Sequence, residues 1–156
     1  MLIALMILVC TGAGIVGGVF FAFSAFVMRA LSQLPASQGV AAMQRINVVV
    51  INPLFLGVFL GTALLAAACI VVSVLDWGTP RSILLLASGV LYLIGSFLVT
   101  LALNVPRNER LAALDPASPQ AAEYWISYLR EWSLWNHVRS AASIASAACC
   151  AGALAM

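Results

Sequence analysis

Charged side chains are scarce in this chain. Asp, Glu, Lys and Arg make up 8% of its 156 residues, whereas soluble domains carry about 25%. Lysine is absent, so all seven basic residues are arginine, and they form no basic run. Apolar residues make up 64% of the chain, and the mean hydropathy is +1.11. This composition excludes a soluble fold and gives no indication of nucleic-acid binding.

Recognisable cofactor and catalytic motifs are also missing. The single histidine, His137, excludes a bis-His haem within one chain, although a single-His or His/Met haem or a metal stays open. Cys10, Cys69, Cys149 and Cys150 show no metal-binding spacing, and we interpret them as small packing residues. There is no HExxH, Walker or Rossmann pattern and no visible Ser-His-Asp set. We therefore predict no cofactor and no metal site.

Long apolar stretches dominate what is present. They cover Leu2–Met28, Val48–Leu75, Ser82–Leu103 and Ser140–Met156. A membrane-spanning helix needs about 20 apolar residues, and β-strands of a barrel would alternate in polarity. The last stretch reaches only about 26 Å, which is short of a hydrocarbon core of about 30 Å, so its helix must begin earlier.

The predicted fold is an all-α integral membrane four-helix bundle. We expect one domain over residues 1–156, with spans at about 2–28, 48–75, 82–103 and 134–156. An additional cytoplasmic or interfacial helical segment should precede the fourth span. The first stretch has no basic leader, so we interpret it as a retained helix in contact with the lipid bilayer.

Arginine positions predict the orientation. Six arginines fall on the connections after the first and third stretches, and only Arg81 falls on the second connection; the six are Arg29, Arg45, Arg107, Arg110, Arg130 and Arg139. Cytoplasmic loops are enriched in basic residues. We therefore expect both termini outside, in a bacterial inner membrane.

The last helix has a marked aromatic face. Ser118 is a plausible N-cap with Pro119 at the first helical position. The 3,4,3,4 spacing then places five side chains on one face, namely Trp125, Tyr128, Trp132, Trp135 and Arg139. We expect one continuous helix from about Pro119 to the C-terminus, with this face toward the bundle.

Aromatic residues gather in the cytoplasmic half of the predicted bundle. Twelve of the fourteen lie there, whereas an anchoring belt would populate both interfaces. This asymmetry predicts a pocket for a flat, apolar aromatic small molecule. Ordinary core packing with one interfacial helix remains the alternative.

Two GxxxG pairs, Gly14/Gly18 and Gly57/Gly61, are interpreted as helix-packing positions, with a homo-oligomer face as the alternative.

Four segments in order resemble the anthrone oxygenase-like family of small four-helix membrane proteins. They are Gly18–Ser24 with Val27-Met28, Met43–Asn47 with Asn52-Pro53, Asn104–Asn108, and Trp132–Arg139. The resemblance implies oxidation of an anthrone to an anthraquinone by O₂, without an established organic cofactor.

The resemblance supplies only the matching positions, and the catalytic and binding roles of individual residues are our own assignment. His137 is the candidate base, because only its side chain has an ordinary pKa near neutrality. Arg139, Asn104 and Asn108 would stabilise the substrate oxygen during proton abstraction and carbanion oxidation. The predicted substrate-binding residues are Phe20, Phe23, Asn47, Asn52, Phe55, Arg107, Trp125, Tyr128, Trp132, Trp135 and Asn136. The alternatives are an accessory membrane protein that holds a quinone, a haem or a partner subunit, and amides that merely cap helix ends.

Overall fold

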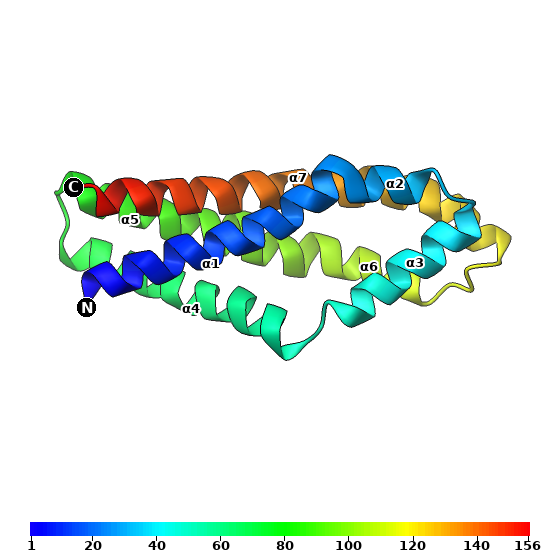
Figure 1. Ribbon diagram of the computed structural model, residues 1–156, viewed down its shortest axis with the longest axis horizontal. Coiled ribbons are helices and arrows are strands. Elements are labelled where there is room, and N and C mark those ends of the chain that lie inside the picture. The colour runs from blue at the N-terminus through cyan, green and yellow to red at the C-terminus, as the bar shows by residue number, and fades with distance from the viewer.

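The computed structural model describes residues 1–156 and contains only helices, which confirms the all-α prediction. Long helices lie side by side (Figure 1). π-helical stretches occur within two continuous helical segments, Leu2–Ser32 and Pro80–Ala112. In chain order the elements are α1 (Leu2–Ala22), η1 (Phe23–Val27), α2 (Met28–Ser32), α3 (Ala36–Val49), α4 (Pro53–Leu75), α5 (Pro80–Val90), η2 (Leu91–Leu98), η3 (Thr100–Asn104), α6 (Val105–Ala112) and α7 (Pro119–Leu154).

Three helical segments are long and apolar enough to cross a membrane: Leu2–Ser32, Pro53–Leu75 and Pro80–Ala112. The chain is therefore a membrane protein. Helix α7 is not among the three, because its first half carries charged and amide side chains. The fourth span at 134–156, and with it the four-helix count, stays a prediction.

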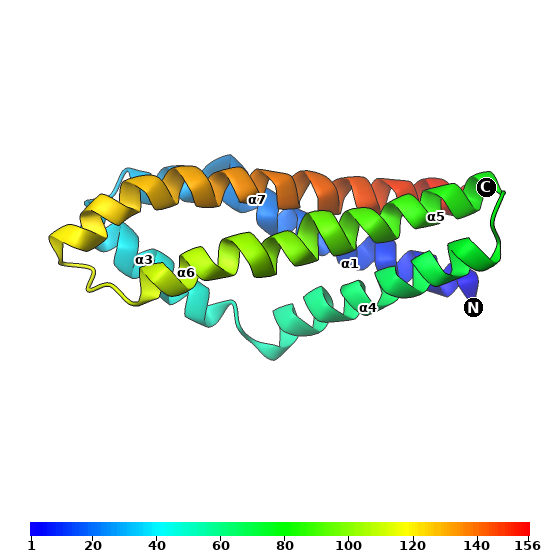
Figure 2. The same cartoon turned by 180° about the vertical axis from the view of Figure 1, so that it is seen from behind.

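Both termini lie at one end of the molecule, together with the turn between α4 and α5 (Figure 1). The connections α2–α3 and α6–α7 lie at the opposite end, as the view from behind also shows (Figure 2). The two polar connections therefore share one end, as expected. The side of the membrane that this end faces stays a prediction.

Helix α7 is the central element of the packing, because it contacts α1, α5 and η2 along its length. Small polar side chains hold it close to its neighbours. The hydroxyl of Ser143 donates to the Ser96 hydroxyl at 2.9 Å, and the hydroxyl of Ser146 donates to the Ser88 carbonyl at 2.8 Å. Such interhelical hydrogen bonds are typical of membrane helices, where no water competes for them.

Side-chain caps set the starts of three helices, α4, α5 and α7. The Ser118 hydroxyl accepts from the Ala121 amide at 3.2 Å, and Pro119 occupies the first turn, as predicted. Asn52 caps α4 in the same way, because its Oδ1 accepts from the Phe55 amide at 3.0 Å. The non-helical residues 50–52 therefore form an elbow between α3 and α4.

The interpretation of the GxxxG pairs as packing positions within the chain is wrong. A Cβ atom added at Gly14, Gly18, Gly57 or Gly61 would meet no atom within 4 Å. These glycines face outward, and the homo-oligomer alternative stays a prediction. Close helix contacts occur instead at other glycines, and a Cβ on Gly89 would lie 2.6 Å from the Ala66 carbonyl oxygen.

This difference gives a stability prediction. Gly89→Ala should lower the free energy of unfolding by about 1–3 kcal/mol, because a backbone carbonyl cannot move aside without shifting α4. The matched control is Gly14→Ala, which places the same methyl group in open space and should leave stability unchanged or slightly raised. Denaturant unfolding in mixed micelles, followed by circular dichroism, measures both. Equal effects of the two substitutions would contradict the packing described here.

Candidate functional site

A cavity of about 270 Å³ lies in the half of the molecule that carries the polar connections. It is lined by 18 residues, of which 14 are hydrophobic. The aromatic part of the lining comprises Phe20, Phe23, Phe55, Phe59 and Trp132, and the polar part comprises Asn47, Thr100, Asn108 and Arg139. Small-molecule sites commonly have this composition, namely an apolar wall with a few polar groups.

Arg139 is the only charged residue that lines the cavity, and its side chain is almost fully buried, with 4% exposed. One guanidinium nitrogen donates to the Thr100 hydroxyl at 3.2 Å, and another donates to Oδ1 of Asn136 at 2.7 Å. The guanidinium also lies over the rings of Phe20 and Trp132, 4.1 and 5.1 Å from their centroids. Rings in this position favour a cation.

No carboxylate pairs with Arg139. The only ion pair in the structure joins Arg107 to Glu131, and the buried Nε–H of Arg139 has no hydrogen-bond partner. A buried charge without a counter-ion is costly and is rarely kept in a protein without a reason. The arrangement therefore provides a positive site, inside an apolar cavity, for an anion that the chain itself does not supply.

Asn136 positions Arg139. It is fully buried, and its Nδ2 donates to the Phe20 carbonyl at 2.7 Å and to the Ser24 hydroxyl at 2.8 Å. The two donations fix the orientation of the amide, so that its oxygen faces the guanidinium. Asn136 thus connects the start of η1 to Arg139.

Asn108 organises the aromatic side of the cavity. Its Oδ1 accepts from the Tyr128 hydroxyl and from Nε1 of Trp132, both at 2.8 Å. Burial raises the pKa of the Tyr128 phenol above its ordinary value. Tyr128 therefore stays protonated at neutral pH and remains a hydrogen-bond donor.

The two fully buried polar atoms of the cavity lining that lack a hydrogen-bond partner are both donors. The buried Nδ2 of Asn47 has no partner, and neither does Nε of Arg139. A ligand that satisfied both would have to present oxygen or another acceptor. The cavity is therefore suited to a flat apolar molecule that carries acceptor oxygens, above all an anionic one.

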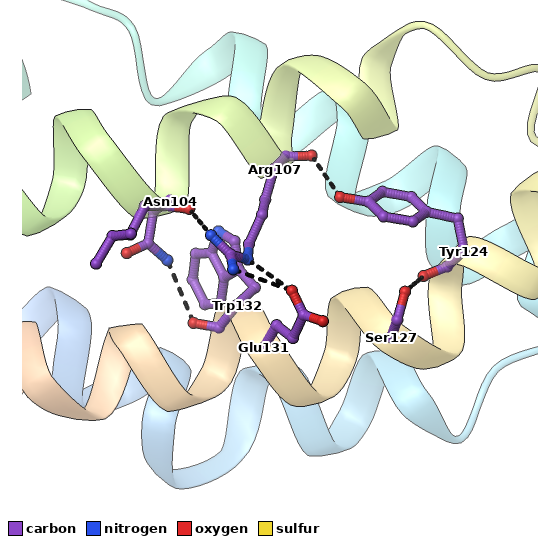
Figure 3. A network of polar contacts seen from close by, with 7 residues as sticks. Asn104, Arg107, Tyr124, Ser127, Glu131 and Trp132 are labelled. Carbon is purple, nitrogen blue, oxygen red and sulfur yellow. Dashed lines mark hydrogen bonds and ion pairs between the residues drawn. The ribbon is translucent and has the colours of Figure 1, made fainter.

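A second polar network lies beside the cavity and connects η3 and α6 to α7 (Figure 3). Nδ2 of Asn104 donates to the Trp132 carbonyl at 3.2 Å. Arg107 donates through Nε and one terminal nitrogen to Glu131, and the Tyr124 hydroxyl donates to the Arg107 carbonyl. Neither Asn104 nor Arg107 lines the cavity. Their hydrogen bonds instead join η3 and α6 to α7.

The structure does not bring His137 to the cavity. Its side chain is exposed, whereas Asn136 and Arg139 are buried. Successive residues of a helix are turned by about 100°, so Asn136 and Arg139 share the inward face and His137 points away from it. No Asp, Glu or His side chain lines the cavity, and no group of His, Cys, Asp and Glu side chains is arranged to hold a metal ion.

The other predicted site residues divide into those that line the cavity and those that lie beside it. Phe20, Phe23, Asn47, Phe55, Asn108, Trp132 and Arg139 line the cavity together. Trp125 and Tyr128 are buried in the core cluster next to it, as expected for the inward face of α7. Trp135 and Asn52 do not line it, because Trp135 is only half-buried on the flank of α7 and Asn52 caps α4.

Thr100 and Phe59 also line the cavity, although neither is among the site residues predicted from the sequence. The signal at Thr100 is a hydroxyl within an apolar span, four residues after Ser96. Its Oγ1 donates to the Ser96 carbonyl at 2.8 Å and receives the hydrogen bond from Arg139. Thr100 begins the π-helical segment η3, and such segments occur frequently at functional sites.

Comparison with known families finds one match over more than half of the chain. The anthrone oxygenase family model matches residues 53–149. This range covers α4 through most of α7, so it includes Asn108, Trp132 and Arg139 but not Phe20 or Asn47. Comparisons with curated proteins and with solved structures find no significant match. The chain belongs to the anthrone oxygenase family.

Proposed function

We propose that the chain oxidises an anthrone-type phenolic substrate with O₂ and that the substrate is bound in this cavity as its anion. One observation carries the proposal: a buried arginine without a carboxylate partner lines an aromatic cavity. Family membership supports oxygenase-like chemistry. The two buried donors without a partner, on Asn47 and Arg139, support an oxygen anion as the ligand.

The chemistry of anthrones fits such a site. An anthrone tautomerises to a phenol, and a nearby guanidinium lowers the pKa of a bound phenol because it favours the charged form. The proton passes to water, and the resulting anion is electron-rich at the carbon opposite the oxygen. Reaction with O₂ at that carbon forms a peroxide anion, which takes a proton back from water to become a hydroperoxide and then loses water to give the quinone. One O₂ is consumed and one water is released for each anthrone oxidised.

Each lining group then has a defined task. The positive charge of Arg139 stabilises the substrate oxygen as charge develops on it. Asn47 donates a hydrogen bond to a second acceptor on the ring system. Phe20, Phe59 and Trp132 offer ring surfaces to a flat molecule. A volume of about 270 Å³, near the lower end of the range of about 300–1,000 Å³ for small-molecule sites, restricts the ligand to a small ring system.

Oxygen uptake by the purified protein tests the proposal. With 1,8-dihydroxyanthrone, uptake should exceed the spontaneous rate measured with heat-denatured protein, and the anthraquinone formed should equal the O₂ consumed. Uptake no faster than the spontaneous rate would reject the oxygenase proposal.

A second candidate function is a binding protein for quinones or phenols. The observation that favours it is the lack of any Asp, Glu or His side chain in the lining, since a proton-abstracting enzyme commonly places such a group there. A binder would show quenching of its tryptophan fluorescence by 1,8-dihydroxyanthraquinone but no oxygen uptake with the anthrone.

His137 gives a prediction that separates this proposal from histidine-based proton abstraction. His137→Gln should retain oxygen uptake within about twofold, because the side chain is exposed and lies outside the lining. If His137 were the general base, the same substitution should lower the rate about 10²–10⁴-fold. Initial rates at several pH values measure the difference. A large loss at every pH would restore His137 as the base.

A further inference from the structure

We infer that the cavity exchanges its ligand directly with the lipid phase, through an opening between α4 and η3. The inference rests on the proposed function, because it assumes that the cavity binds an apolar phenolic molecule. It goes beyond that function in naming the source of the substrate. The substrate would be a neutral, membrane-partitioned molecule taken from the bilayer.

The opening is defined by lining residues that also reach the surface. Ile51, Leu60 and Leu101 line the cavity and are 68%, 46% and 48% exposed. At the other end of the cavity, Phe59 and Arg139 are 5% and 4% exposed. The cavity therefore runs from an aliphatic rim at the surface to the cation in the interior.

The rim lies between two of the candidate membrane spans. Leu60 belongs to Pro53–Leu75 and Leu101 belongs to Pro80–Ala112. Helix α4 packs against α5 and η2, and its Pro53 end lies apart from the rod that contains η3 and α6 (Figure 2). The elbow at residues 50–52 allows this divergence, because it ends α3 before α4 begins.

The exposed side chains on either side of the elbow are aliphatic as well. Val48, Val49 and Leu54 flank the elbow and are 62%, 59% and 80% exposed. Exposed aliphatic patches of this kind are disfavoured in water and are normal against lipid tails. A mouth used by solutes from water would carry polar groups at its edge, and none of the three exposed rim residues is polar.

This geometry assigns an order to events at the site. A neutral phenol crosses the aliphatic rim, because a charged one would pay the large cost of entering hydrocarbon. It ionises only beside Arg139, where the guanidinium favours the anion. Selection for apolar substrates is thus made at the rim, and selection for an acidic oxygen is made in the interior.

Binding kinetics in phosphatidylcholine vesicles test the route. The probe is 1,8-dihydroxyanthraquinone, which does not react with O₂, and the signal is the quenching of tryptophan fluorescence in a stopped-flow instrument. Leu101→Trp should slow association and dissociation by at least about tenfold each, because the larger side chain obstructs the path between the lipid and the cavity. Kd is measured separately at equilibrium, since Leu101 also lines the cavity. Leu101→Ala should accelerate both rates.

Leu98→Trp is the matched control. Leu98 is 50% exposed, lies on the same rod close to Leu101, and does not line the cavity. Its rates should match those of the wild type. An anthraquinone disulfonate, which stays in water, should bind far more slowly than the neutral probe. Unchanged rates in both Leu101 variants, or equal slowing in Leu98→Trp, would overturn the inference.

The same preparations separate the failure of this inference from the failure of the proposed function. Oxygen uptake together with binding rates that do not change in the Leu101 variants would reject the lipid route but not the oxygenase proposal. Rim-dependent binding without oxygen uptake would support the route and reject the oxygenase. If Leu101→Trp does not fold, the acceleration expected for Leu101→Ala still decides the matter.

Discussion

Arg139→Gln is expected to lower oxygen uptake with an anthrone by about 10²–10³-fold, the usual cost of losing a group that stabilises a developing oxyanion. Gln keeps a polar side chain that can still reach Asn136, but it removes the only charge in the cavity lining. The pH dependence should change as well. Without the guanidinium the bound phenol holds its proton more tightly, so the half-maximal rate should move to higher pH by at least about one unit.

Two controls make the Arg139 result specific. Arg139→Lys keeps the charge and should retain more activity than Gln. Arg110→Gln removes a charge at an exposed position where the guanidinium lies 4.2 Å from the Tyr124 ring centroid, outside the cavity, and should leave the rate and the pH profile unchanged. The melting temperature of Arg139→Gln should hold or rise, because an unpaired buried charge costs free energy. A rate loss with an unshifted pH profile would contradict anion stabilisation.

Asn108→Ala is expected to lower the free energy of unfolding by about 2–5 kcal/mol. The substitution removes one acceptor from two donors, the Tyr128 hydroxyl and Nε1 of Trp132. Each stranded donor of this kind costs about 1–3 kcal/mol when it stays buried. Denaturant unfolding in mixed micelles, followed by circular dichroism, measures the change.

Asn108→Asp separates the structural task of this residue from the chemistry. Aspartate keeps an acceptor for both donors, so most of the stability should be recovered. It also places a carboxylate in the same cavity as Arg139, where it competes with an anionic ligand, so oxygen uptake should remain low. Full activity in Asn108→Asp would argue against an anionic substrate. Full stability in Asn108→Ala would show that the two donors find other partners.

Much of the fold could be predicted from the sequence, because its signals are local. The start of α7 at Ser118-Pro119 depends on one cap and one proline, and both work within a single turn. The inward face that carries Trp125, Trp132 and Arg139 follows from helical periodicity, and all three side chains are buried as expected. The GxxxG spacing failed as a packing signal because it cannot specify which side of a helix meets a neighbour.

The candidate site was predictable in part for the same reason. The sequence placed aromatic and amide residues in one half of the molecule, and the structure brings seven of the predicted residues to one cavity. The sequence alone could not decide whether His137 or Arg139 is the functional residue of the site. Their angular separation on α7 was evident from the sequence, but which of the two faced inward depended on neighbouring helices.

The sequence by itself determined that this is an all-helical membrane protein with its polar and aromatic residues gathered at one end, because hydropathy, periodicity and caps act over a few residues. Only the tertiary structure decided that Arg139 is buried without a counter-ion, that Asn136 and Thr100 hold it, and that the cavity has an aliphatic rim. These features arise where α1, α4, η3 and α7 meet. Contacts between segments so distant in the chain depend on helix packing, which no local pattern encodes.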